Sequence, residues 1–168
     1  MRYKITFLLI ALMLVKETFA EELATGPLHK QYDSWSYDNY HVVKNNTRTL
    51  WFVDYYDISH RQNELGDSAL ILTFIPEKLT QEKVRTATIE ALEDSNPGIN
   101  INDTSIQKLV NSLSVSLVEK DVIAIIYNGK TMQVQHNDNV IYQAQSTSKQ
   151  SMALSNIWLG ENPVDDLL

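Results

Sequence analysis

VIAIIYNGKTMQVQHNDNVIYQAQ, residues 122–145, is the stretch that decides the fold. Its first six residues, 122–127, form an apolar run of strand-forming types, and Asn128-Gly129 behind them is a strong signal for a two-residue hairpin turn. Residues 130–136 run back, an Asn-Asp-Asn turn follows, and residues 140–145 return. The stretch therefore predicts a three-stranded antiparallel meander.

The chain closes on STSKQSMALSNIWLGENPVDDLL, Ser146–Leu168, which predicts a short helix. Thr147 and Gln150 have the spacing of a capping box at its start. Gly160, with Pro163 just beyond it, predicts its end. The face expected to dock on the sheet is apolar and consists of Leu154, Ile157 and Trp158.

Upstream of the meander, Ala69–Ile75 is a nearly continuous apolar run, which predicts a strand in the centre of the sheet. Two one-sided helices follow, the first capped by Thr80 and ended by Asn96-Pro97-Gly98, the second capped by Asp103. The stripe expected to be buried on the first helix is Val84, Ala87, Thr88, Ala91 and Leu92. Strands, helices, strands and a final helix predict an α+β fold, an antiparallel β-sheet with helices packed on one face.

An aromatic segment from Tyr32 to Tyr56 precedes these elements. Asn45-Asn46 predicts a turn between two strands, the second of which spans Thr47–Ile58. Arg61–Ser68 is expected to be a polar loop.

The first twenty residues have the features of a secretory signal peptide. Arg2 and Lys4 form a basic start, Ile5–Val15 is an apolar run, and Thr18-Phe19-Ala20 predicts cleavage after Ala20. This run of eleven residues, interrupted only by Thr6, falls short of the roughly 20 that a membrane-spanning helix needs, which disfavours the alternative of an uncleaved anchor. We therefore expect a periplasmic protein with one domain, residues 21–168.

Composition excludes several classes of partner and site. Removal of the leader leaves 11 basic and 20 acidic residues, a net charge of −9, which disfavours nucleic acid and anionic membranes. There is no cysteine, hence no disulfide, thiolate metal site or cysteine nucleophile.

No catalytic motif is present: there is no G-x-S-x-G, no phosphate-binding glycine loop and no H-E-x-x-H. Asp57 and His60 are three residues apart, and a surface pair at the end of a strand is favoured over a metal site. His136 is expected to be exposed at a hairpin end. Asp54 and Asp57 could orient a tyrosine or arginine near a pocket, but the favoured interpretation places them in water at a sheet edge. No cofactor, metal or catalytic residue is predicted.

The predicted strand Thr47–Ile58 offers one binding pattern. One of its faces would carry a cation, two apolar side chains and a phenol, which suits an amphipathic carboxylate such as a fatty acid. The favoured alternative is that this arginine extends from a strand end and pairs with an acidic residue on the surface. The candidate ligand-binding residues are Arg48, Leu50, Phe52 and Tyr56, with the neighbouring Tyr55.

Four segments resemble bacterial chalcone-isomerase-like proteins of the exported branch. The closing IWLGENPVDDLL resembles the end of those proteins, and the resemblance extends over residues 47–168. The other segments are ALILTFIPEKLTQEKV, TLWFVDYYDISHR and VEKDVIAIIYNGKTMQVQHNDNVIY. The resemblance implies an open-faced β-sandwich, a large antiparallel sheet with a helical layer and a cleft between the two.

The resemblance implies binding rather than catalysis. Plant chalcone isomerases cyclise a chalcone with an arginine, a threonine and a tyrosine, but Val53 falls about where that threonine would be, and His41 lies nearer the spacing of the arginine than Arg48 does. Non-catalytic relatives bind fatty acids in the same cleft. We therefore expect a non-catalytic protein that binds a small apolar or amphipathic ligand. The alternatives are a chalcone-type intramolecular lyase or isomerase, and a cell-envelope interaction module that docks a partner through Tyr32–Tyr40.

Overall fold

The computed structural model of the 168-residue chain describes residues 32–50, 53–164 and 167–168. Within these residues, six antiparallel strands form one sheet in the order β1-β2-β3-β6-β7-β8, and two short strands form a second one. The strands of the large sheet are β1 His41–Leu50, β2 Val53–Gln62, β3 Ser68–Phe74, β6 Val122–Tyr127, β7 Thr131–His136 and β8 Asn139–Gln145. The small sheet pairs β4 Lys78–Leu79 with β5 Leu117–Val118.

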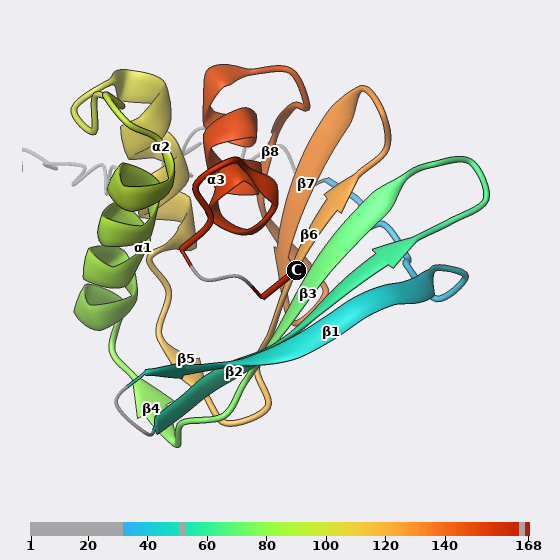
Figure 1. Ribbon diagram of the computed structural model, residues 1–168, viewed down its shortest axis with the longest axis horizontal. Helices are drawn as coiled ribbons and strands as arrows, with labels where there is room; N and C mark the ends of the chain where they lie inside the picture. Colours follow the sequence, from blue (N-terminus) through green and yellow to red (C-terminus); the bar gives the residue numbers. More distant parts are fainter. Residues whose placement is uncertain (1–31, 51–52, 165–166) are drawn as a thin grey trace, which may run out of the picture. The chain divides into compact units, whose positions relative to one another are not determined.

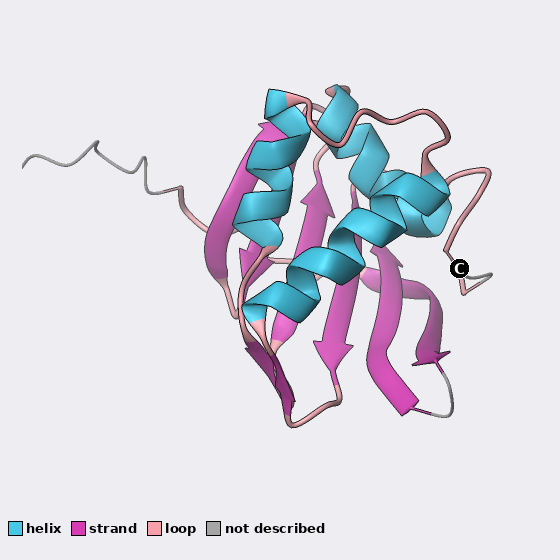
Figure 2. Ribbon diagram, turned by 90° about the vertical axis from the view of Figure 1, so that its left-hand side faces the viewer, coloured by secondary structure: helices cyan, strands magenta, loops and turns pink. Residues whose placement is uncertain are grey.

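The described helices are α1 Gln81–Ser95, α2 Thr104–Leu113 and α3 Lys149–Leu159. They cover one face of the large sheet, on the left in Figure 1 and in front of the strands in Figure 2. This arrangement confirms the predicted α+β fold, with an open sheet and helices on one side. All of these elements belong to a unit that begins at residue 31, so the predicted domain start at residue 21 and the leader before it lie outside the described residues.

The two apolar runs lie in the middle of the sheet, the place that the sequence predicted for Ala69–Ile75. β3 pairs with β2 on one side and β6 on the other, so neither central strand is at an edge. Side chains alternate between the faces: Leu70, Leu72, Ile123 and Ile125 join the core under the helices, while the residues between them face the other way.

Both predicted turns of the meander are confirmed. Gly129 has φ of 79°, a conformation that a residue without a Cβ adopts at little cost. Asn137 and Asp138, with φ of 47° and 63°, form a two-residue turn between the paired residues His136 and Asn139.

The predicted turn at Asn45-Asn46 is wrong. Both residues lie inside β1, where Asn45 pairs with Ser59 and Asn46 pairs with Ile58 of β2. Because β1 is an edge strand, its amide side chains meet solvent or the chain end, and the Asn46 Nδ2 donates to the Leu167 carbonyl at 3.4 Å. The first strand of this hairpin therefore continues past Asn45-Asn46 to Leu50 and is longer than the sequence suggested.

The loop predicted at Arg61–Ser68 is shorter than expected, because β2 continues to Gln62. Its turn is built by Asn63, whose side-chain oxygen accepts from the backbone N–H of Leu65 at 3.0 Å and of Asp67 at 2.9 Å. This Asx-type bonding replaces ladder bonds at the strand end.

The helix ends agree with the sequence except at one cap. Thr80 and Asp103 cap α1 and α2 as predicted, and α3 ends at Gly160. The predicted cap Thr147 is wrong: α3 is capped by Ser148, whose hydroxyl lies 2.9 Å from that of Ser151. The face of α3 predicted to dock is buried, as expected; it consists of Leu154, Ile157 and Trp158.

The face of the sheet away from the helices is covered by an arm, residues 32–40 (blue in Figure 1). Two glutamines of β7 hold it: Trp35 N–H donates to Gln133 Oε1 at 2.9 Å, and Gln135 Nε2 donates to the Trp35 carbonyl at 3.0 Å. Gln133 Nε2 also donates to the Asp33 carbonyl at 3.1 Å. The backbone groups of Asp33 and Trp35 therefore form hydrogen bonds with glutamine side chains and not with the backbone of a neighbouring strand.

Candidate functional site

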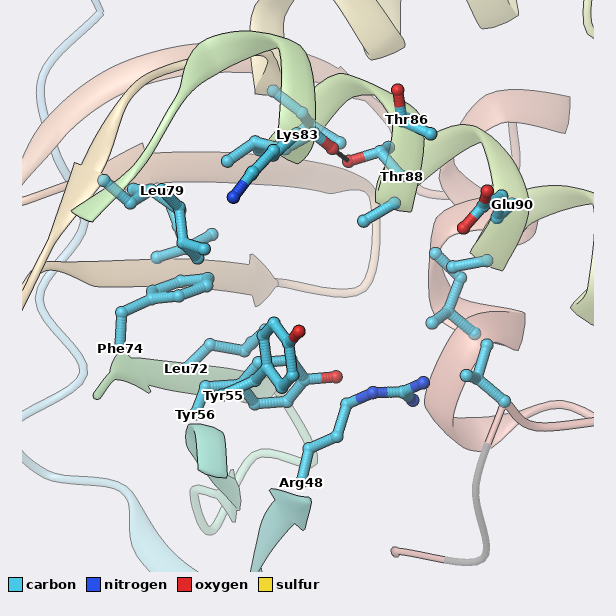
Figure 3. A pocket seen from close by; sticks show the side chains of 18 of the residues that line it. Arg48, Tyr55, Tyr56, Leu72, Phe74, Leu79, Lys83, Thr86, Thr88 and Glu90 are labelled. Carbon is cyan, nitrogen blue, oxygen red and sulfur yellow. Dashed lines mark hydrogen bonds between the residues drawn. The ribbon is translucent and has the colours of Figure 1, made fainter. Parts of the chain in front are cut away.

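A cavity of about 770 Å³ lies on the helix side, between α1 and the sheet. Its apolar wall comes from β3, β5, β6, α3 and the segment before α1; it includes Leu72, Phe74, Leu79, Leu117, Ile123, Ile125, Leu154, Ile157 and Trp158. The helix above it contributes small side chains, chiefly Ala87 and Ala91, and charged ones. Figure 3 shows several of these residues around the open space.

The cavity exists because α1 does not fill the space beneath it. On the stripe predicted to be buried, Leu92 is fully buried, but Ala87 is exposed, and Val84, Thr88 and Ala91 are only half-buried. Alanine and threonine side chains are too short to reach the sheet. The prediction of a uniformly buried stripe is therefore wrong, and the gap it misses is the candidate site.

Three of the five predicted ligand-binding residues line this cavity: Arg48, Tyr55 and Tyr56. The sequence placed them on one strand, Thr47–Ile58, and this prediction is wrong. Arg48 lies on β1 and pairs with Tyr56 on β2. The register shifts between Arg48 and Thr49, which marks a bulge beside the site. Phe52 and the side chain of Leu50 lie outside the described residues.

Tyr56 is held in place by a buried neighbour. The Trp158 Nε1 of α3 donates to the Tyr56 hydroxyl oxygen at 3.0 Å, and the Tyr56 ring lies 5.7 Å from that of Phe74. Trp158 is only 7% exposed, so the contact fixes the phenol between sheet and helix. The sequence predicted a core role for Trp158, and the structure adds a hydrogen bond to a cavity residue.

The charged groups of the cavity come from two walls. Arg48 projects from the sheet, and Lys83 projects from the first turn of α1 (Figure 3). Farther along α1 the wall also includes the carboxylates of Glu90 and Asp94. Sequence reasoning missed Lys83, although it lies four residues before Ala87 and so on the same helix face.

The remaining sequence candidates lie elsewhere. Asp54 and Asp57 are exposed, and each accepts a 2.6 Å hydrogen bond across the hairpin, from Thr49 and Thr47 respectively. His60 lies three residues after Asp57 in β2, and three residues place side chains on opposite faces of a strand. Burial lowers the pKa of His60.

His136 is not the exposed histidine that the sequence predicted. Its Nε2 lies 3.2 Å from Asp121 Oδ2, and its side chain is 22% exposed. Asp121 also accepts from the Val118 N–H at 2.9 Å and from Asn137 Nδ2 at 2.8 Å. The pair thus connects the residue before β6 with the last residue of β7. In the described part of the chain, no three His, Cys, Asp or Glu side chains are grouped to hold a metal ion.

The aromatic arm packs against its own sheet. Trp35, Tyr37 and Tyr40 contact a buried cluster of Ala69, Ile71, Ala124 and Ile126 on the face away from the helices. The Arg61 guanidinium lies 5.9 Å from the centre of the Tyr37 ring. Two aromatics expected to dock a partner, Trp35 and Tyr37, are therefore partly buried within the molecule. None of the described helices has the length and apolarity to cross a membrane.

Comparison with known proteins agrees with this architecture. A search of curated proteins found no match. Among solved structures, the fatty-acid binding protein of Arabidopsis thaliana has a similar fold, with a TM-score of 0.64 and 14% sequence identity over 80% of this chain and 86% of that one. Residues 45–168 match the sequence model of the chalcone isomerase-like family. The resemblance noted in the sequence is thereby confirmed, and the chain belongs to the chalcone isomerase-like family.

Proposed function

We propose that this protein is an exported, non-catalytic binding protein for a fatty-acid-like molecule, which it holds in the cavity between α1 and the sheet. The observation that carries the proposal is the amphipathic character of that cavity: a mostly apolar wall with a guanidinium and two phenols on the sheet side. Such a wall suits a ligand with an apolar chain and one acidic group.

The size of the cavity fits this class of ligand. Small-molecule pockets have volumes of roughly 300–1,000 Å³, and this cavity has about 770 Å³. Each methylene group moved from water into the apolar wall contributes about 0.8 kcal/mol. A long alkyl chain therefore supplies most of the affinity, and polar groups decide its direction.

The sheet side offers groups for a carboxylate. A guanidinium has five N–H donors, so Arg48 can hold a carboxylate oxygen while it keeps another partner. Tyr55 and Tyr56 present hydroxyl groups to the same cavity (Figure 3). We assign the carboxylate position to Arg48 and the apolar chain to the space between Phe74 and Trp158.

Two further observations support binding over catalysis. The Arabidopsis protein of similar fold is named for fatty-acid binding. The position that corresponds about to the threonine of plant chalcone isomerases is Val53, whose side chain cannot hydrogen-bond a reacting carbonyl. Export is proposed from the leader alone, and N-terminal sequencing of protein recovered from the periplasm tests it: the mature chain is expected to begin at Glu21.

A titration with dodecanoic acid tests the proposed function. Calorimetry is expected to give saturable binding to the wild type and binding about tenfold weaker or more to Arg48→Met, because a charged hydrogen bond is lost. Arg61→Met is the matched control, since Arg61 lies on the opposite face of the sheet. Absence of binding to the wild type would contradict the proposal, and equal affinity of the two variants would contradict the role of Arg48.

A further inference from the structure

A lysine at the beginning of α1 faces the cavity from the helix side. Lys83 lines the cavity, and Figure 3 shows its ammonium group directed from α1 toward Leu79 and Phe74. Among the described residues, no carboxylate forms an ion pair with Lys83. The ammonium group of this exposed lysine thus lies beside an apolar wall, and the carboxylate of the neighbouring Glu82 also lines the cavity.

The position is unfavourable for a cation within the helix itself. Lys83 is the third residue of α1, which begins at Gln81 after the cap Thr80. The N-terminal end of a helix carries partial positive charge, so anions are stabilised there and cations are not. An acidic ligand group at this end of the cavity would be attracted by both the ammonium group and the helix terminus.

Arg48 approaches the same cavity from the other wall. Figure 3 shows Lys83 above and Arg48 below, with Phe74, Leu72 and the tyrosine rings on the wall between them. The two cations are therefore separated by apolar surface and do not form one cluster. A single carboxylate therefore contacts one of them and not the other.

We propose that Lys83 is a ligand-binding residue and that, together with Arg48, it makes the cavity selective for molecules with an acidic group at each end of an apolar chain, such as α,ω-dicarboxylic acids. This inference rests on the proposed function, since it concerns the same cavity. Glu90 and Asp94 lie about two and three turns farther along α1. Their repulsion disfavours an acidic group at that end of the wall, whereas at the other end the carboxylate of Glu82 has the ammonium group of Lys83 beside it in the chain.

Binding of dodecanedioic acid, compared with that of dodecanoic acid, tests the inference. The two ligands have the same chain length and differ in the second carboxylate. We expect the diacid to bind the wild type about tenfold more tightly, as one additional charged hydrogen bond implies. Lys83→Met, which keeps most of the length of the side chain, is expected to remove this advantage, so that this variant binds the two acids with nearly equal affinity.

Lys78→Met is the matched control, because Lys78 is an exposed lysine of β4 that does not line the cavity. It is expected to retain the preference for the diacid. Equal affinity of the wild type for the two acids, or a preference that survives Lys83→Met, would overturn the inference while leaving the proposed function intact. If neither acid binds the wild type, the proposed function fails and the inference fails with it.

Discussion

At the scale of single residues, the contact between Trp158 and Tyr56 joins the closing helix to the hairpin that carries Arg48. The indole N–H has an acceptor in the Tyr56 hydroxyl at 3.0 Å, and Trp158 is nearly buried. A donor of this kind loses water on folding and needs a partner in the protein. The hydrogen bond therefore stabilises the fold and orients a phenol of the cavity at the same time.

Replacement of Tyr56 by phenylalanine tests this contact. Tyr56→Phe leaves the indole N–H of Trp158 without its acceptor and is expected to lower the free energy of unfolding by about 1–3 kcal/mol. Urea denaturation followed by Trp fluorescence measures the change. Tyr55→Phe, in which the neighbouring cavity phenol changes in the same way, is expected to stay within about 0.5 kcal/mol of the wild type. Equal effects of the two substitutions would show that the hydrogen bond to Trp158 is not the cause.

A second prediction at this scale concerns pH. Burial lowers the pKa of His60 below its ordinary 6.5, so the folded protein favours the neutral ring while the unfolded chain takes up a proton near pH 6.5. The contribution of His60 to stability is therefore full above pH 6.5 and is lost as the pH falls through the lower pKa of the folded state. Urea denaturation at pH 8, 6.5 and 5 is expected to show a smaller loss of stability in His60→Asn than in the wild type. Parallel curves for the two proteins would contradict this.

At the scale of secondary-structure elements, periodicity predicted most of the fold. The apolar runs became β3 and β6, and the asparagine-rich turns of the meander lie where the sequence put them, because local turn chemistry and burial act together there. The turn at Asn45-Asn46 was wrong because an edge strand tolerates asparagine, so composition alone does not separate a turn from such a strand.

The arm was beyond sequence reasoning for a different reason. Its aromatic residues suggested strands or a docking surface, but its backbone is held by the side chains of Gln133 and Gln135, nearly 100 residues away. Polar side chains in a strand predict a solvated face. Here they are fully buried under the arm. Contacts between segments so far apart leave no local pattern.

The hydrogen bond between the arm and Gln133 predicts the effect of Gln133→Met. The substitution removes the acceptor of the Trp35 N–H and is expected to destabilise the protein by about 1–3 kcal/mol. Hydrogen exchange is expected to be faster at the Trp35 amide, whereas amides of α2 keep nearly the same local protection. Gln145→Met at the exposed end of β8 serves as the control. Unchanged exchange at Trp35 would mean that Gln133 does not hold the arm.

At the scale of the whole molecule, the sheet and the helical layer enclose a cavity that no single element shows. The sequence singled out Arg48, Tyr55 and Tyr56, and all three line it, although from a hairpin and not from one strand. It missed Lys83 and the other cavity residues of α1. Small residues such as Ala87 and Ala91 suit tight packing against a sheet as well as they suit the wall of a cavity. The distance between two layers is set by all the residues that pack between them, which a single helix pattern does not contain.

Native mass spectrometry of the wild type and Ala91→Trp, each mixed with dodecanoic acid, tests most directly whether this cavity binds the ligand. Ala91 lines the cavity, so an indole at this position fills part of it, while Met152→Trp adds the same group at an exposed site on α3. Binding in this cavity predicts a ligand-bound mass for the wild type and Met152→Trp, and binding weaker by about tenfold or more for Ala91→Trp. A wild type that stays ligand-free, or an Ala91→Trp protein that binds equally well, would contradict it.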